Sequence, residues 1–237
     1  AANGNATISE FTADFASGGA SGFPATFQVN LQNATATFDQ GAPFDIGSTI
    51  DGVAHGNNGW GIFGQQANDQ TAVFQTDGPL STNRLVFEID HSSPFGDHKL
   101  QEFRLSYTTD ANPTASDASI DWIELTPTDA STSLGASNAS FDSVSNIVSV
   151  SGSGGVSDIY QIIAEGQFTD ITGFRLEALT GANGLVGFNS GGGNGNIVLS
   201  EFNVFAQEVP EPTSIAIWSL LGLALCGFGY RKLRRKA

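Results

Sequence analysis

The feature that most constrains this chain is its last stretch, Val209–Ala237, because it contains an uninterrupted apolar run. The stretch opens with Pro210, Glu211 and Pro212, continues with apolar or small residues over Ile215–Tyr230, and ends with five of the chain's nine lysines and arginines. As a helix, such a run would be about 24 Å long, which is close to the ~30 Å hydrocarbon core of a bilayer.

We therefore predict a transmembrane helix over 213–230, capped by Thr213 or Ser214 after the two prolines. Basic residues tend to stay on the cytoplasmic side, so the C-terminus would be cytoplasmic and everything before Val209 would lie outside. The alternative is a buried core helix with a solvated basic end. The run has no polar face, which favours the membrane helix.

This tail, 208–237, resembles the PEP-CTERM sorting signal of Gram-negative bacteria in its motif, order and position. The resemblance implies recognition at Pro210, Glu211 and Pro212 by an exosortase-type membrane transpeptidase. The protein would be held transiently in the inner membrane by its C-terminal helix and would then reach the cell surface or the extracellular matrix. Such proteins are commonly associated with exopolysaccharide.

The charge of the remaining chain limits its partners. Residues 1–208 carry 4 basic and 23 acidic side chains, a net charge of −19. Nucleic acid and anionic membranes are poor partners for such a surface. The single cysteine, Cys226, lies within the apolar run, so the exported part has no disulfides and needs a hydrophobic core of ordinary size.

The exported part is predicted to be all-β, a jelly-roll β-sandwich over 31–207, because short alternating stretches recur between turn-forming residues. One such turn is Asp77-Gly78-Pro79. Little helix is expected outside the tail, and long loops are expected over 39–69 and 181–195. The predicted strands are 27–31, 34–38, 71–75, 85–89, 103–107, 120–125, 147–150, 159–163, 174–178 and 197–205.

Residues 1–30 are predicted to be an N-terminal strand segment. Gly4–Phe11 is similar to Gly195–Phe202, and both end in Ser-Glu-Phe. The segment is therefore either the remnant of an upstream module or an extra strand beside the first sheet. Ala1 is not an initiator Met and no signal peptide follows it, so we expect a processed chain or a piece of a longer product.

The stretch around Asp51-Gly52 and Asn58-Gly59-Trp60, with the later strand at Leu199–Val204, resembles discoidin or F5/8 type C modules, which are galactose-binding-like jelly rolls. It is also similar to domains of planctomycete surface proteins. The resemblance implies a structural Ca²⁺ held by Asp51, Asn58 and Glu201, whose oxygens suit that ion. Alternatively, Asp51 only starts a turn and Glu201 faces water.

Trp60 and Phe63 are the candidate ligand-binding residues, because their rings could stack on a sugar; alternatively, they plug the end of the sandwich. No catalytic residue is predicted, since no nucleophile elbow or zinc motif is present. We expect a non-enzymatic binding module for exopolysaccharide or a surface protein. The alternatives are a structural Ca²⁺-binding matrix protein and, less favoured, a polysaccharide hydrolase.

Overall fold

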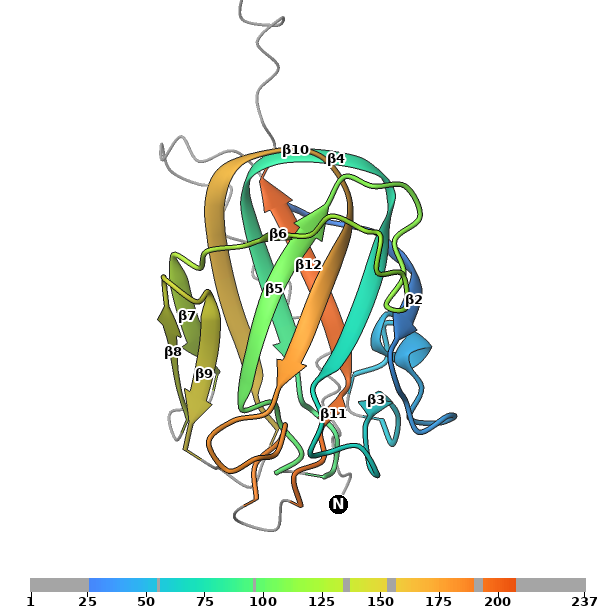
Figure 1. Ribbon diagram of the computed structural model, residues 1–237, viewed down its shortest axis with the longest axis vertical. Coiled ribbons are helices and arrows are strands. Elements are labelled where there is room, and N and C mark those ends of the chain that lie inside the picture. The colour runs from blue at the N-terminus through green and yellow to red at the C-terminus, as the bar shows by residue number, and fades with distance from the viewer. Residues whose placement is uncertain are drawn as a thin grey trace, which may run out of the picture.

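The structure is a computed structural model that describes residues 26–207 except 55, 96, 134–136, 153–156 and 190–193. Its one helical segment in this part is the short 3-10 helix η1 (Ile46–Thr49), and all other elements are strands (Figure 1). The strands are β1 (Thr26–Gln28), β2 (Leu31–Ala36), β3 (Trp60–Gly61), β4 (Gln70–Asp90), β5 (Glu102–Thr108), β6 (Ile123–Glu124), β7 (Asp129–Thr132), β8 (Asn138–Asp142), β9 (Ile147–Ser151), β10 (Ile159–Leu179), β11 (Val198–Leu199) and β12 (Glu201–Gln207).

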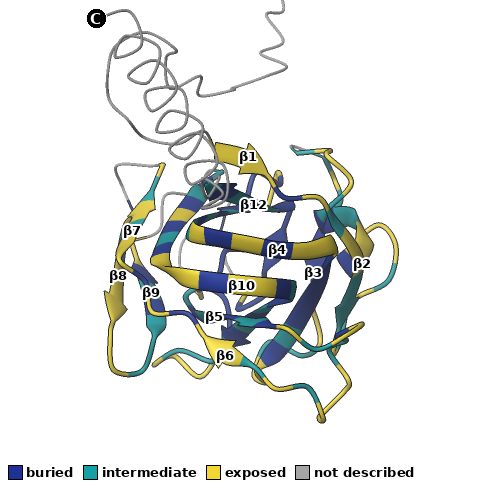
Figure 2. Ribbon diagram, turned by 90° about the horizontal axis from the view of Figure 1, so that it is seen from above, coloured by how far each residue is buried: buried dark blue, intermediate teal, exposed yellow. Residues whose placement is uncertain are grey.

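Two long bent strands organise the sandwich. β4 and β10 pair antiparallel from Gln70↔Ala178 to Asp90↔Ile159, and register shifts interrupt the pairing between Glu165 and Gly173. At these shifts both strands bend over the upper end of the molecule, where they lie side by side (Figures 1 and 2). Each strand therefore takes part in both layers of the sandwich.

The two halves of β4 and of β10 pair with different strands. The first half of β4 and the second half of β10 form one layer with β2, β5, β9 and β8, and β6 pairs with β5. The second half of β4 and the first half of β10 form the other layer with β12, β1 and β7. The predicted break into separate strands at Asp77-Gly78-Pro79 is therefore wrong, because the ladder resumes at Leu80↔Ile171.

The core fills the space between the two layers. Phe74 of β4 stacks on Phe202 of β12, with ring centroids 4.2 Å apart, and Phe87 of β4 meets Phe174 of β10 edge to face at 5.4 Å. All four side chains are buried. Each buried apolar side chain of this size contributes about 1.5–3 kcal/mol, so packing across the layers replaces the missing disulfides.

The prediction of an all-β sandwich with very little helix is confirmed for the described residues. Strands β7 and β8 were not predicted, and only Ile123–Glu124 of the predicted strand 120–125 forms. The described end of the predicted N-terminal segment, Thr26–Gln28, pairs with β12 and so belongs to the sandwich. Residues 1–25 of that segment lie outside the described residues.

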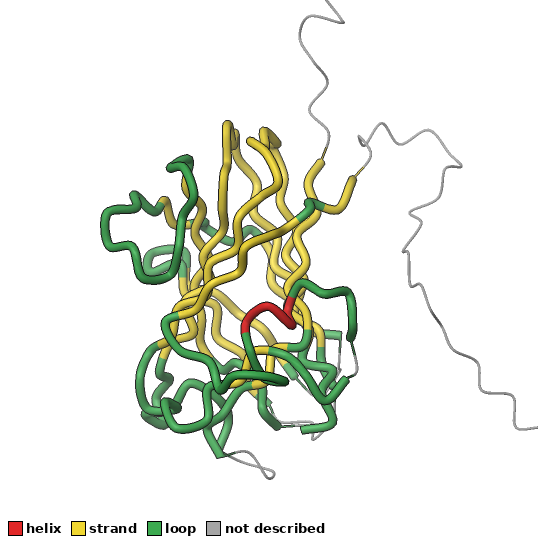
Figure 3. The backbone as a smooth tube through the Cα atoms, turned by 90° about the vertical axis from the view of Figure 1, so that its right-hand side faces the viewer, coloured by secondary structure: helices red, strands yellow, loops and turns green. Residues whose placement is uncertain are grey.

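Most of the described loops gather at the end of the sandwich opposite the bends, called here the lower end (Figure 3). It consists of the described parts of 37–69, 91–101 and 180–200, together with the ends of the strands that they join. Among the described residues, no helix is long and apolar enough to cross a membrane. The predicted membrane helix and the triplet Pro210, Glu211 and Pro212 lie outside the described residues.

Candidate functional site

The structure brings the three predicted cation ligands together at the lower end. Asp51 follows η1, Asn58 precedes β3, and Glu201 is the first residue of β12. Asn58 Nδ2 donates to Asp51 Oδ2 at 3.3 Å, and Asp51 Oδ1 accepts the Val53 N–H at 2.8 Å. The Asp-Gly turn predicted from the sequence thus forms, and it places the Asp51 carboxylate against Glu201.

Glu201 is only 4% exposed and has an unusual protonation equilibrium. Its pKa is raised from 4.5 to about 7, first by burial and then by the hydrogen bond and the charge of Asp51. The charge of Asp90 also raises the pKa, while the Val53 N–H lowers it. In the metal-free protein the Glu201 carboxyl group therefore keeps its proton up to about neutral pH.

Two oxygens of this cluster are buried without a hydrogen-bond partner among the described residues, Asn58 Oδ1 and Glu201 Oε1. A buried acceptor without a donor costs about 1–3 kcal/mol, and a cation would remove that cost. The donors are carboxylate and amide oxygens, which are the ligands that Ca²⁺ takes. The residues present therefore fit a hard divalent cation.

In the described part of the chain, no group of three His, Cys, Asp or Glu side chains is placed to hold a metal ion. The three predicted ligands include only two carboxylates, so a cation here would also need backbone carbonyl oxygens or water, since Ca²⁺ takes about six to eight oxygens. A backbone carbonyl ligand has no residue type of its own, so the sequence could not indicate one.

A cleft with a volume of about 310 Å³ lies beside the cluster. Its walls are the link between β1 and β2, the end of η1 and the start of β12, and Asp51 and Glu201 line it. In the lining of the cleft, Gln28 Nε2 donates to Asn203 Oδ1 at 2.9 Å. Asp51 and Glu201 thus line the same cleft as the amide side chains of Gln28 and Asn203.

The carboxylate pair is not arranged as in a glycosidase. The two carboxyl groups of such enzymes stand about 5–9.5 Å apart, which leaves room for the sugar bond and a nucleophile or water. Asp51 and Glu201 are instead in hydrogen-bond contact. This pair is consequently suited to sharing a cation or a proton, and not to flanking a glycosidic bond.

Trp60 lies in the core. Its side chain is fully buried, and Nε1 donates to the Phe38 carbonyl oxygen at 2.8 Å. Because no face of the indole is open, the expected stacking of Trp60 on a sugar does not fit this structure; the residue plugs the end of the sandwich. Phe63, in the loop that leads into β4, is 53% exposed and keeps its ring available for contact.

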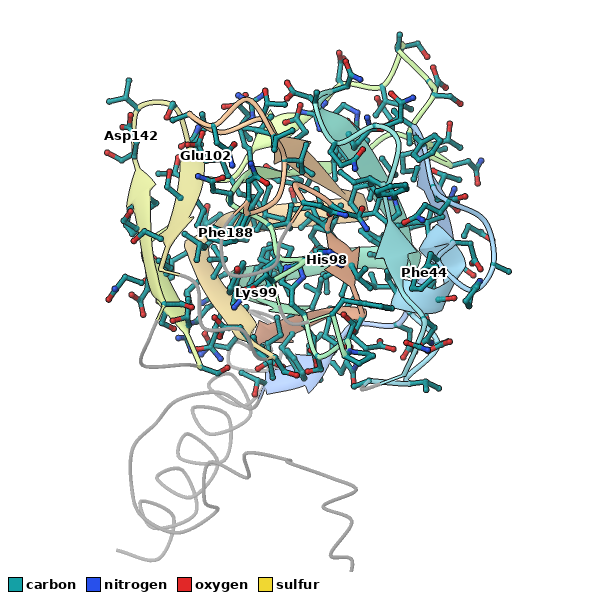
Figure 4. The ribbon with its side chains drawn as sticks, turned by 90° about the horizontal axis from the view of Figure 1, so that it is seen from below. Phe44, His98, Lys99, Glu102, Asp142 and Phe188 are labelled. Carbon is teal, nitrogen blue, oxygen red and sulfur yellow. The ribbon has the colours of Figure 1, made fainter. Side chains whose placement is uncertain are left out.

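An aromatic cluster that the sequence analysis missed lies at the same end. Phe95 stacks on His98, with centroids 5.6 Å apart, and meets Phe44 edge to face at 5.8 Å. Phe95 is 38% exposed, and Figure 4 shows Phe44 and His98 on the lower end. Phe95 follows Ser93-Pro94, which form a turn. An aromatic residue in a turn does not lie on the buried face of a strand. This position could have indicated from the sequence that the Phe95 ring is exposed.

The chain has three histidines, His55, His91 and His98. His55 lies outside the described residues. Burial lowers the pKa of the half-buried His98, and its Nδ1 has no hydrogen-bond partner among the described residues. His91 is buried in the fold.

Comparison with known proteins gives structural neighbours only. No protein-family model matches the sequence, and no curated protein matches it. The family 32 carbohydrate-binding module of Clostridium perfringens NanJ, solved with galactose, is 11% identical, with 76% of this chain and 99% of that chain covered and a TM-score of 0.44. An F5/8 type C domain from Bacteroides fragilis is 13% identical, with 76% and 99% covered and a TM-score of 0.46.

A third neighbour is the family 32 carbohydrate-binding module of Streptococcus pneumoniae EndoD. It is 12% identical, with 78% of this chain and 98% of that chain covered and a TM-score of 0.42. The neighbours are therefore carbohydrate-binding modules of family 32 and F5/8 type C domains. At these identities the likeness concerns the fold and not the ligand.

Proposed function

We propose that this protein is a non-catalytic carbohydrate-binding protein that contacts sugar through the exposed aromatic rings at the lower end. The observation that carries the proposal is the exposure of Phe63 and Phe95, 53% and 38%, on loops held by a rigid sandwich. Binding residues lie disproportionately on loops that a folded scaffold positions. A phenyl face can pack against the apolar face of a sugar ring.

The negative charge of the domain limits the classes of ligand that it can bind. With 4 basic and 23 acidic side chains over 1–208, the surface repels polyanions. A neutral exopolysaccharide is therefore the proposed partner, and a neighbouring surface protein is the alternative. Nucleic acid is not proposed as a ligand.

We also propose that the protein is exported and sorted, because of the sequence of its C-terminal stretch. Pro210, Glu211 and Pro212 would be recognised by an exosortase-type transpeptidase while the predicted helix over 213–230 holds the chain in the inner membrane. The product would then reach the cell surface or matrix. Mass spectrometry of the surface protein from a host with an exosortase tests this: loss of the apolar run is expected, and an intact Ala237 terminus would contradict it.

The alternative function is a structural matrix protein that binds Ca²⁺ without recognising a sugar. It is favoured by the contact of Asp51 with Asn58 and Glu201 and by the two unpaired buried oxygens there. Calcium at this site and sugar binding at the aromatic rings are compatible, so the alternative differs only in lacking the sugar. A polysaccharide hydrolase has no supporting observation in this cluster.

Calorimetric titration of the full chain with neutral polysaccharides tests the proposal. Phe63→Ala and Phe95→Ala should each weaken binding about tenfold, which corresponds to about 1.4 kcal/mol. Phe141→Ala is the matched control, because Phe141 is similarly exposed, 37%, but lies on β8 at the edge of the sheet. Equal weakening by all three changes, or no heat with any polysaccharide, would contradict sugar binding at the lower end.

A further inference from the structure

The loop that carries Phe95 and His98 is attached to the body of the sandwich by backbone hydrogen bonds. The His98 N–H donates to the Phe95 carbonyl oxygen at 2.9 Å, which joins the two ends of the turn between these rings. The Val198 N–H of β11 donates to the His98 carbonyl oxygen at 2.8 Å. The position of the two stacked rings therefore depends on the position of Val198.

His91 contacts the carbonyl group of the same Val198. Its ring is 1% exposed, and its Nδ1 lies 3.0 Å from the Val198 carbonyl oxygen. Its Nε2 accepts a hydrogen bond from the Leu100 N–H at 3.4 Å. One buried side chain thus links the end of the loop to the strand on which the turn is fastened.

These two contacts require a neutral ring with its proton on Nδ1. A carbonyl oxygen can only accept and a backbone N–H can only donate, so Nδ1 must donate and Nε2 must accept. Burial, the largest effect, lowers the pKa of His91 to about 4. Among the groups that face the ring, the charge of Lys99 lowers the pKa further, and the Val198 hydrogen bond and the charge of Asp158 raise it. The ring is therefore neutral at pH 7.

Leu100 is fixed at its carbonyl group as well. The Tyr160 hydroxyl donates to the Leu100 carbonyl oxygen at 3.1 Å, and the Tyr160 ring lies 5.1 Å from the ring of His91. Tyr160 belongs to β10, and His91 directly follows β4. The two long strands of the sandwich therefore determine where the loop ends.

We propose that His91 is a positioning residue for the aromatic cluster of the lower end. Its neutral ring joins Leu100 to Val198 and so holds the Phe95 ring where a sugar can reach it. His91 itself is buried and does not contact the sugar. For its functional consequence this inference rests on the proposed sugar binding, and it adds a residue on which the arrangement of the binding surface depends.

Amide hydrogen exchange of the full ¹⁵N-labelled chain at pH 7 tests the inference. His91→Phe fills the space but can neither donate nor accept, so exchange at Leu100 and Val198 should become about tenfold faster than in the natural protein. His91→Gln keeps one donor and one acceptor and should leave both amides nearly unchanged.

Gln75→Leu is the matched control. Gln75 is also buried, and it links Asn33 to the Pro113 carbonyl oxygen away from the lower end. Its replacement should leave exchange at Leu100 and Val198 unchanged relative to the other amides. A purely structural role of His91 would instead accelerate the amides of the whole domain together.

Calorimetric titration with galactomannan and dextran, two neutral polysaccharides, is the second readout. His91→Phe should weaken binding about tenfold, and His91→Gln should retain it. Unchanged exchange at Leu100 and Val198, equal acceleration of all amides, or unchanged binding by His91→Phe would overturn the inference, and the proposed function would stand if Phe95→Ala still weakened binding. If exchange changes as expected but the natural protein binds neither polysaccharide, the proposed function fails and the positioning of the loop by His91 stands.

Discussion

Replacing Glu201 by Gln should stabilise the protein at pH 8 without Ca²⁺ and should change its stability little with Ca²⁺. Glutamine keeps the size of the side chain but removes its charge. In the folded metal-free protein the pKa of Glu201 is about 7 and its ordinary value is 4.5. Because the folded-state pKa is raised, the folded protein loses stability as the pH rises from 4.5 through 7. At about 1.4 kcal/mol per pKa unit, the loss at pH 8 is about 3 kcal/mol.

Glutamine at position 201 does not titrate, so the variant does not lose this free energy of unfolding as the pH rises. In EDTA at pH 8, Glu201→Gln should therefore be more stable than the natural protein by up to about 3 kcal/mol, and at pH 4.5 the two should be nearly equal. With Ca²⁺ at a hundred times its Kd, the natural protein gains about 2.7 kcal/mol, which the variant should largely lose because a ligand carboxylate is missing.

Guanidinium denaturation of both proteins in EDTA and in Ca²⁺, at pH 4.5 and pH 8, measures these free energies of unfolding. Glu165→Gln is the control, because its carboxylate is 60% exposed and pairs with Arg84 at the surface; it should change stability by less than about 1 kcal/mol. If Glu201→Gln destabilises the protein equally in EDTA and in Ca²⁺, Glu201 is not a strained carboxylate at a cation site.

Two further predictions concern buried side chains. Burial lowers the pKa of His91 from 6.5 to about 4, and its ring lies between the Val198 carbonyl oxygen, 3.0 Å from Nδ1, and the Leu100 N–H, 3.4 Å from Nε2. The neutral ring is thus favoured in the folded state, so about 3 kcal/mol of stability is present above pH 6.5 and lost as the pH falls to 4. In a denaturant series over pH, His91→Phe should remove that loss, and an unchanged pH dependence would contradict it. Trp60→Ala should cost about 3–5 kcal/mol in calorimetric melting because the ring is fully buried; an unchanged midpoint with loss of sugar binding would return Trp60 to the binding surface.

The sequence predicted the fold class well because short alternating stretches report burial of one strand face. It failed at β4 and β10, where a Gly-Pro pair in β4 was interpreted as the end of a strand. Pro79 lies in the bend, where the ladder with β10 is already interrupted. Whether a strand ends or bends at such a place depends on a partner far along the chain, which local patterns do not reveal.

Strands β7 and β8 were missed for another reason. Asp129–Thr132 and Asn138–Asp142 are short, mostly polar and poorly buried, so they lack the apolar alternation that predicts a strand. They pair at the edges of the sheet with β10 and β9. Backbone hydrogen bonds to existing strands, and not burial of their side chains, determine their conformation.

The candidate site was partly predictable. The Asp51-Gly52 turn and the acidic start of β12 were identified from the sequence, but their contact joins residues 150 positions apart and needs the folded sandwich. Trp60 and Phe63 looked alike in the sequence because both lie in the glycine-rich stretch 59–64. The short pairing of β3 with β11 turns Trp60 inward, whereas Phe63 remains exposed.

Nuclear magnetic resonance of the ¹⁵N-labelled chain, titrated with a neutral oligosaccharide in Ca²⁺, tests sugar binding at the lower end most directly. We expect the amide signals of Phe63 and Phe95 to shift on titration, while those of Phe141 on β8 do not. An unchanged spectrum with every neutral oligosaccharide, or shifts confined to β8, would contradict the assignment of a sugar-binding surface to the lower end.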